Sequence, residues 1–106
     1  MTVRQQRRVA ITGLGLVTPL GNDVAATWHA LLAGRSGVAP ITHFDASGFP
    51  VRIAGEVKGF DPRHAIEDRK LLKFADRSHV MALAAAEEAL RDAGIRPGGS
   101  DATRWA

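Results

Sequence analysis

Three basic side chains, Arg69, Lys70 and Lys73, lie within one stretch of five residues. Residues three or four apart on a helix are neighbours, so helical spacing would gather these cations on one exposed face. A face of this kind attracts acidic partners and speeds their encounter, although a short run of positive charge is usually just hydrated surface. We predict a small cationic patch at this segment.

Two glycines, Gly13 and Gly15, follow the short apolar run at residues 8–12. A dinucleotide site places a Gly-x-Gly-x-x-Gly turn between a strand and the N-terminus of a helix, where the pyrophosphate binds. Here the third glycine position holds Thr18, and Pro19 keeps Thr18 extended, which delays the helix. The pattern therefore predicts a turn and disfavours a nucleotide site.

Other chemistry has few candidates. The chain has no cysteine, which excludes disulfides, thiol chemistry and cysteine–zinc sites within its 106 residues. The four histidines, at positions 29, 43, 64 and 79, do not share the short spacing of zinc ligands. Glu87, Glu88 and Arg91 fall on the predicted outer face of a helix, where a solvated ion pair is the ordinary interpretation.

Composition indicates a soluble globular chain that is one domain or part of one. The apolar residues make up 45% and the charged residues 24%. The formal charge of +3 is spread along the chain, which biases it mildly toward acidic partners. No apolar run is long enough to span a membrane, and the start lacks a signal-peptide cleavage pattern, so we expect a cytoplasmic protein.

The elements that must position these residues begin with a buried strand at residues 8–12 (RVAIT). Asn22 is predicted to cap a helix, and Gly34 is predicted to end it. The apolar residues of that helix share one face: Val24, Trp28, Leu31 and Leu32.

The second half is predicted to hold a half-exposed strand and two helices. Residues 35–50 are interpreted as irregular and residues 51–58 as the strand. A short helix is expected over residues 66–75. A long alanine-rich helix is expected from its cap at Asp76 to Gly94, where Ile95 closes a Schellman turn with Leu90. A long helix in an α/β fold leads into a parallel strand, and none follows here, so the predicted fold is an incomplete α/β fold.

Residues 9–21 (VAITGLGLVTPLG) resemble the opening signature of the β-ketoacyl-[acyl-carrier-protein] synthases, particularly the type II enzymes that elongate fatty acids, the 3-oxoacyl-ACP synthase II-like members. The resemblance covers nearly the whole chain in the family's order. It continues through TWHALLAGRSG at 27–37, HFD at 43–45, AGEV at 54–57, FD at 60–61, DRK at 68–70, DR at 76–77 and AAAEEALRDAGI at 84–95.

The resemblance implies a thiolase-like fold, in which two similar α/β halves build an α-β-α-β-α layered sandwich and usually pair as a homodimer. Residues 1–106 would be a partial N-terminal domain, about the first quarter, with residues 102–104 just before the next core strand. The family's catalytic cysteine and its two histidines lie downstream. The resemblance therefore implies no catalytic residue in this chain, no activity of the chain alone, and no cofactor or metal.

In this family, basic residues on the segment that matches Arg69, Lys70 and Lys73 face the acidic acyl carrier protein. This sequence has Lys73 where arginine is common and Phe74 where another basic residue is common, so the patch is weaker than in other members. The resemblance implies acyl- and malonyl-loaded carrier proteins as partners, and neither nucleic acid nor membrane.

The function implied by the resemblance is elongation of acyl chains in fatty-acid biosynthesis, by decarboxylative Claisen condensation of an acyl-enzyme with malonyl-carrier protein. An alternative is a catalytically silent fragment or a partner subunit like the chain-length factors of polyketide synthases. A third hypothesis, a small nucleotide-binding protein, is disfavoured by the glycine pattern. We also expect the isolated chain to be poorly soluble or molten, because absent strands would leave alanine-rich helix faces exposed.

Overall fold

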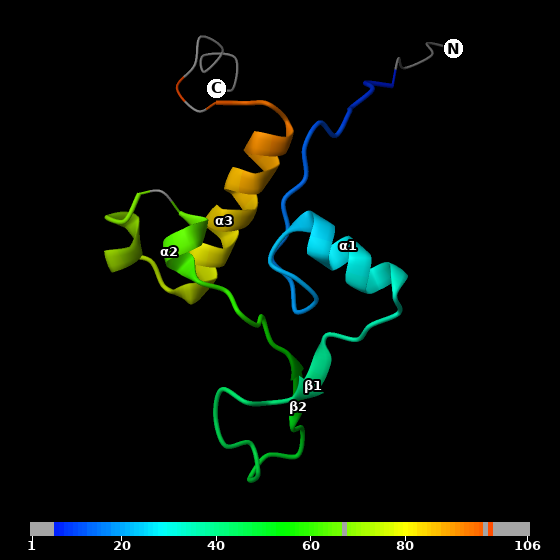
Figure 1. Cartoon of the computed structure of the whole chain (residues 1–106), viewed down its shortest axis with the longest axis vertical. Coiled ribbons are helices and arrows are strands. Elements are labelled where there is room, and N and C mark those ends of the chain that lie inside the picture. The colour runs from blue at the N-terminus through cyan, green and yellow to red at the C-terminus, as the bar shows by residue number, and fades with distance from the viewer. Residues whose placement is uncertain (1–5, 67, 97, 99–106) are drawn as a thin grey trace.

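The chain forms an open arrangement of helices with one small hairpin. The computed structural model describes residues 6–66, 68–96 and 98, so the resemblance at 102–104 lies outside it. The elements in chain order are α1 (Val24–Leu32), β1 (Val38–Pro40), β2 (Ile53–Gly55), α2 (Pro62–Ala65), the 3₁₀ turn η1 (Leu71–Lys73) and α3 (Arg77–Asp92). Figure 1 shows the hairpin projecting away from the helices. The radius of gyration is 18.4 Å, whereas a compact domain of about 100 residues has about 13 Å.

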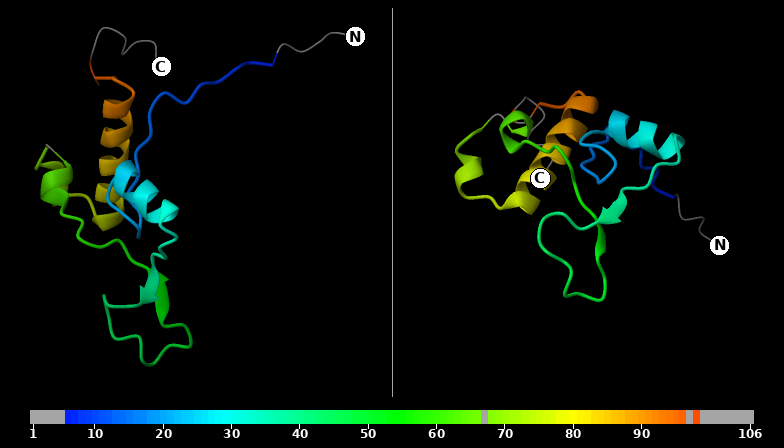
Figure 2. Two further views of the ribbon diagram at one scale, coloured as in Figure 1. Left: turned by 45° about the vertical axis from the view of Figure 1, so that its right-hand side comes forward. Right: turned by 60° about the horizontal axis from the view of Figure 1, so that its bottom comes forward.

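Residues 6–17 run as an extended segment whose later part, from Gly13, lies beside α3, and the strand predicted at residues 8–12 is not formed (Figure 1, Figure 2). A strand needs a neighbouring strand for its ladder of hydrogen bonds. The sheet of the described residues contains only β1 and β2, which lie away from this segment. Val9 is consequently 87% exposed and Ile11 is 80% exposed.

Helix α1 begins one residue later than predicted, because its N-cap is Asp23 and not Asn22. Asp23, with extended backbone, accepts a hydrogen bond from the Ala26 N–H at 2.7 Å and is the N-cap. Asn22 instead donates from its side chain to the Lys58 carbonyl at 3.0 Å, so its prediction as the cap is wrong. The end at Gly34 is confirmed, because Gly34 adopts a positive φ of 67°, which glycine tolerates best.

The predicted apolar face of α1 is largely uncovered. Trp28 is 59% exposed, Leu31 is 53% exposed and Leu32 is 69% exposed. The buried residues of this helix are Thr27 and Ala30. The sequence pattern therefore identified a face for packing that the described residues do not cover.

The hairpin occupies part of the region interpreted as irregular. β1 pairs antiparallel with β2, with Ala39 opposite Ala54, and the strand predicted over 51–58 is confined to Ile53–Gly55. The Glu56 carboxylate accepts hydrogen bonds from the Thr42 N–H and hydroxyl and from the His43 N–H. These contacts, led by the Thr42 N–H, hold the pKa of Glu56 below its usual value.

The short helix predicted over residues 66–75 is not formed in the described part of that range, which holds only one 3₁₀ turn, and a separate one-turn helix, α2, lies before it. Asp61 caps α2 and Pro62 is its first residue, which suits proline because that position needs no backbone donor. The 3₁₀ turn is η1, Leu71–Lys73. The connection between the described elements is thus irregular where an α-helix was expected.

Helix α3 matches its prediction at both ends. Asp76 accepts a hydrogen bond from the His79 N–H at 3.0 Å, and the Ser78 hydroxyl is the main cause that lowers the pKa of Asp76. Ile95 donates its N–H to the Leu90 carbonyl at 2.9 Å, which confirms the Schellman turn. This helix is the longest described element, and α2 packs against it.

The core of the described part is small. Its buried residues are Thr27, Ala30, Ala46, Ile66 and Val80, and no large side chain within this part is fully buried. Helices with one antiparallel hairpin are consistent with a partial α/β fold, although the described residues contain no parallel sheet. No helix within the described ranges is long and apolar enough to cross a bilayer.

Candidate functional site

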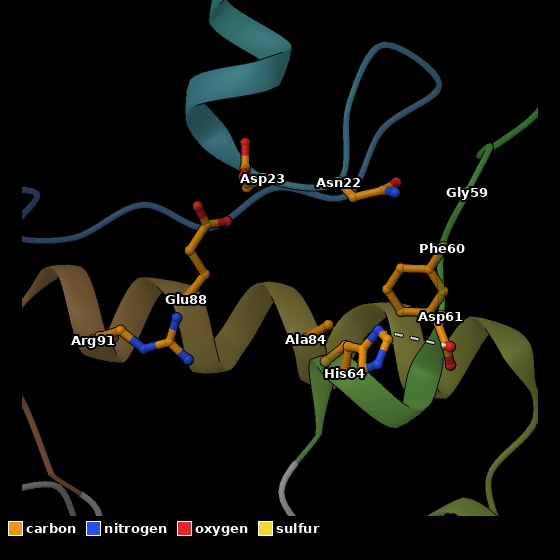
Figure 3. A pocket seen from close by; sticks show the side chains of 10 residues that line it. Asn22, Asp23, Gly59, Phe60, Asp61, His64, Ala84, Glu88 and Arg91 are labelled. Carbon is orange, nitrogen blue, oxygen red and sulfur yellow. Dashed lines mark ion pairs between the residues drawn. The ribbon is translucent and has the colours of Figure 1, made fainter.

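Two acidic side chains of α3 hold the extended N-terminal segment and the start of α1. The Glu88 carboxylate accepts the Leu16 N–H at one oxygen and the Val24 N–H at the other, each at 2.9 Å. Asp92 accepts the Leu14 N–H at 3.0 Å. Figure 3 shows Glu88 pointing from α3 toward the N-terminal end of α1, where a negative charge is favourable. One helix thereby fixes two segments that are distant in sequence.

The glycines of the Gly-x-Gly pattern permit this close approach. A Cβ on Gly13 would overlap the Ala89 carbonyl oxygen and lie 2.7 Å from the Ala93 nitrogen. A Cβ on Gly15 would overlap the Ala85 carbonyl oxygen. The space beside both glycines is filled by the backbone of α3, so these glycines serve the packing of the N-terminal segment on that helix.

The prediction that placed Glu88 on the outer face of its helix is wrong. Glu88 is half-buried and directed toward the N-terminal segment. A signal was present in the sequence, since Glu88 and Asp92 border the stripe formed by Ala85, Ala89 and Ala93. An alanine stripe of this spacing marks the face of a helix that packs closely.

A pocket of about 350 Å³ lies between α2, α3 and the start of α1. Figure 3 draws its side chains. They are Asn22, Asp23, Gly59, Phe60, Asp61, His64, Ala65, Ala84, Glu88 and Arg91. Glu88 is already bound to two backbone N–H groups, so its carboxylate serves the packing of the chain.

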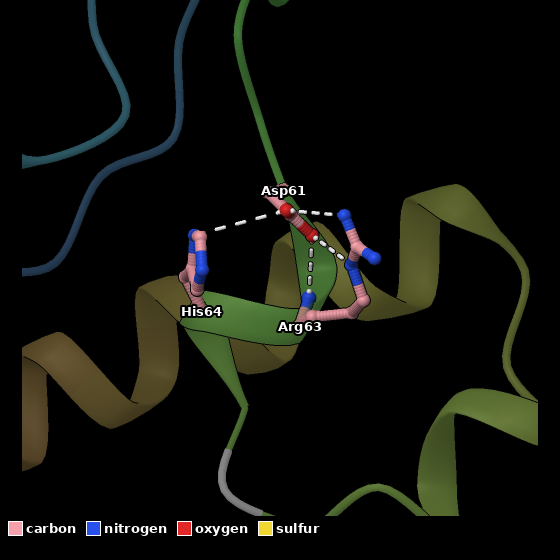
Figure 4. Close-up of polar contacts among 3 residues, drawn as sticks. All are labelled: Asp61, Arg63 and His64. Carbon is pink, nitrogen blue, oxygen red and sulfur yellow. Dashed lines mark hydrogen bonds and ion pairs between the residues drawn. The ribbon is translucent and has the colours of Figure 1, made fainter.

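A second pocket carboxylate, Asp61, is kept ionised by Arg63, and the third, Asp23, caps α1. The Arg63 guanidinium donates from Nε and Nη2 to the two Asp61 oxygens at 3.1 and 3.0 Å (Figure 4). His64 Nδ1 lies 3.7 Å from Asp61 Oδ2. These contacts, mainly the Arg63 side chain, lower the pKa of Asp61 to about 2. A general acid for neutral pH needs a raised pKa, so Asp61 is unsuited to that role.

Metal-binding geometry is absent from the described residues. No group of three or more histidine, aspartate or glutamate side chains within them is placed to hold a metal ion. Of the histidines, His79 lies 2.8 Å from the capping Asp76, and His64 lies in α2 beside Asp61.

The three basic residues singled out in the sequence are all exposed. They lie on a turn rather than on the predicted α-helix. Lys73 donates its N–H to the Lys70 carbonyl at 3.3 Å, the i to i+3 bond of a 3₁₀ helix. Side chains three residues apart eclipse in this geometry. The structure therefore brings Lys70 and Lys73 to the same side and leaves Arg69 one position away.

Comparison with known proteins identifies one family. The model of the β-ketoacyl synthase N-terminal domain matches residues 6–105. The 3-oxoacyl-[acyl-carrier-protein] synthase 2 of Coxiella burnetii is 49% identical over 94% of this chain and 24% of its own length. The tetracenomycin polyketide synthase ketoacyl synthase beta subunit of Streptomyces glaucescens is 48% identical over 84% of this chain and 22% of its own length.

A solved structure agrees with these sequence matches. The ishigamide ketosynthase/chain length factor aligns with a TM-score of 0.72 and 40% identity, over 81% of this chain and 21% of the solved chain. The chain thus spans about a quarter or less of the length of these relatives.

Proposed function

Since this chain belongs to the β-ketoacyl synthase family, we propose that it is the N-terminal part of a 3-oxoacyl-[acyl-carrier-protein] synthase of fatty-acid elongation. The observation that carries the proposal is the family match over residues 6–105, together with 49% identity to a relative of that name. The whole protein would transfer an acyl group to an enzyme nucleophile and condense it with a malonyl group as carbon dioxide leaves. We place it in the cytoplasm as a homodimer.

The nucleophile of this reaction must come from residues outside the chain. The chain contains no cysteine, and the three carboxylates of its pocket are engaged in packing, in an ion pair and in capping α1. We therefore assign residues 1–106 a structural and docking role within a partial domain that is inactive alone. The uncovered apolar side chains of Val9, Ile11 and Trp28 support further layers packing against this part.

The experiment for the reaction is a condensation assay of the full-length protein. Purified protein is given an acyl-loaded carrier and malonyl-loaded carrier, and the 3-oxoacyl product is detected by mass spectrometry. Product formed by this protein alone supports the proposal. Its absence, with an active relative as positive control, contradicts it.

A second candidate function is a chain-length-factor-like partner subunit. It is favoured by the 48% identity to the tetracenomycin beta subunit and by the likeness to the ishigamide ketosynthase/chain length factor. A subunit of that kind would form no product alone and would restore product when mixed with an active ketosynthase partner. The same assay, run with and without such a partner, distinguishes the two functions.

The exposed lysines of η1 support docking of an acidic carrier protein. Charge complementarity mainly raises the rate of encounter, and salt screens it. We expect Lys70→Glu combined with Lys73→Glu in the full-length protein to lower kcat/KM for carrier-bound substrate about tenfold at low salt, and much less at high salt. Arg35→Glu, at an exposed site next to α1, is the control for a charge reversal away from the patch. Unchanged kcat/KM at low salt would contradict docking by this patch.

A further inference from the structure

The turn that carries the lysines also carries two exposed apolar side chains. Three i to i+3 hydrogen bonds shape it: the N–H groups of Leu71, Lys73 and Phe74 donate to the carbonyls of Asp68, Lys70 and Leu71. Side chains three apart eclipse in this geometry. Lys70 and Lys73 therefore form a cationic row, and Leu71 and Phe74 form an apolar row beside it.

The apolar row reaches far into the solvent. Phe74 is 91% exposed and Leu71 is 46% exposed. The Phe74 ring is the most exposed of the large apolar side chains in the described ranges. Burying an aromatic ring against a partner is favourable, because it removes a large apolar area from water. A fully exposed ring therefore offers binding free energy to a partner.

The neighbours of Phe74 distinguish it from the apolar side chains that await cover by the rest of a synthase. Lysine ammonium groups cannot be buried without a partner of opposite charge. Lys73 directly precedes Phe74, and Lys70 lies one turn before it, both exposed. A dry layer of the same fold over Phe74 would have to cover these cations as well. An acidic partner that arrives from solvent has no such difficulty.

We propose that Leu71 and Phe74 form the apolar centre of the carrier-docking surface, with Lys70 and Lys73 at its rim. This inference rests on the proposed function and names what the partner must present. The partner is the acidic surface of the carrier protein, with an apolar side chain placed over Phe74 and carboxylates placed against the two lysines. Binding energy at interfaces concentrates in central aromatic residues, whereas rim charges set the rate and the orientation.

Salt separates the two contributions experimentally. The dissociation constant of purified holo-acyl carrier protein is measured for the full-length protein at about 20 mM and about 500 mM salt. We expect Phe74→Ala to weaken binding about tenfold at both salt concentrations, because apolar contact is not screened. The paired lysine reversals should weaken binding mainly at the lower one. Phe49→Ala, at a 55% exposed aromatic of the distant hairpin loop, is the matched control and should leave affinity unchanged.

Different results would overturn this inference and the proposed docking of the carrier protein. If Phe74→Ala binds as the parent protein does while the lysine reversals weaken binding, carrier docking stands and the apolar centre is overturned. If neither variant weakens binding, both fall. The rest of the polypeptide could itself cover Phe74, and thermal unfolding of the full-length protein tests this. If Phe74 is exposed, Phe74→Ala leaves Tm nearly unchanged. A fall in Tm of about 5 °C or more would show that the ring is buried and would overturn the proposal.

Discussion

At the scale of single residues, Glu88 has the most consequential placement. One carboxylate accepts backbone N–H groups from the extended segment and from the first turn of α1, and both bonds are 2.9 Å long. A backbone N–H that loses its partner costs free energy unless water replaces it. The side chain is therefore a structural clamp between three segments.

Replacement of Glu88 should reveal this clamp. Glu88→Gln keeps one acceptor oxygen and substitutes a donor for the other, so one of the two N–H groups loses its partner. We expect the free energy of unfolding to fall by about 1–3 kcal/mol in the full-length protein, measured by denaturant titration. Glu87→Gln, one residue earlier on the same helix, should change it by less than about 0.5 kcal/mol. Equal effects of the two substitutions would contradict the clamp.

A second prediction at this scale concerns Asp61. The Arg63 side chain is the main cause of its low pKa, and His64 contributes least. Arg63→Gln should therefore raise the pKa of Asp61 from about 2 toward its ordinary 3.8, whereas His64→Ala should leave it low. Carboxyl carbon shifts in an NMR titration measure both. A larger rise in the His64 variant would contradict this assignment.

The pKa of Asp61 also sets the direction of its effect on stability. The folded pKa is depressed below the ordinary 3.8, so the contribution of this ion pair is present above that value. It is lost as the pH falls from about 3.8 through about 2. The parent protein should therefore have a higher free energy of unfolding than Arg63→Gln above this pH range, and the difference should disappear as the pH falls through it.

At the scale of elements, the packing of the N-terminal segment on α3 depends on glycine. The nearest atoms to a Cβ at Gly15 belong to the backbone of Ala85 and Ala89, which cannot rotate away as a side chain can. Any larger residue would push the segment off the helix and stretch the bonds to Glu88 and Asp92. Both the glycines of the segment and the two carboxylates of α3 thus stabilise the packing of the N-terminal segment on that helix.

Gly15→Ala should consequently be strongly destabilising. We expect a loss of about 3 kcal/mol or more, since overpacking against backbone leaves no low-energy adjustment. Gly48→Ala is the control, because no atom lies within 4 Å of its added Cβ. It should be neutral or slightly stabilising, as the unfolded chain loses freedom. Thermal unfolding of both full-length variants measures the difference, and similar Tm values would contradict the close packing.

At the scale of the whole molecule, little apolar surface is buried within the described part. The alanine stripe of α3 is partly covered by the glycine-containing segment, so the expectation that its faces lie open is only partly met. Apolar side chains lie uncovered on α1 and the extended segment, where Trp28 and Val9 are 59% and 87% exposed. A core of small residues stabilises a fold weakly.

The isolated 106-residue chain should therefore be molten or poorly soluble. We expect retained far-ultraviolet circular dichroism, weak near-ultraviolet signal and binding of a hydrophobic dye such as ANS. The same chain within the full-length protein is the control and should unfold cooperatively. A sharp, cooperative transition of the isolated chain in calorimetry would contradict the prediction.

The sequence by itself determined the features that depend on neighbours along the chain. The cap at Asp76, the end at Gly34 and the turn from Leu90 to Ile95 were predicted because their hydrogen bonds join residues a few positions apart. The signature at residues 9–21 indicated the family, and the family model confirmed it. The docking role of Arg69, Lys70 and Lys73 stays a prediction.

Only the tertiary structure decided what joins residues far apart. Glu88 contacts residues 72 and 64 positions earlier in the chain, and no local pattern states which N–H group it will meet. The strand predicted at residues 8–12 failed for the same reason, since a strand is completed by a partner from elsewhere. At the η1 turn, the change from an α-helix to i to i+3 bonds kept Lys70 and Lys73 on one side and left Arg69 one position away from them. Local propensity is too weak to choose between those two geometries, so packing decides.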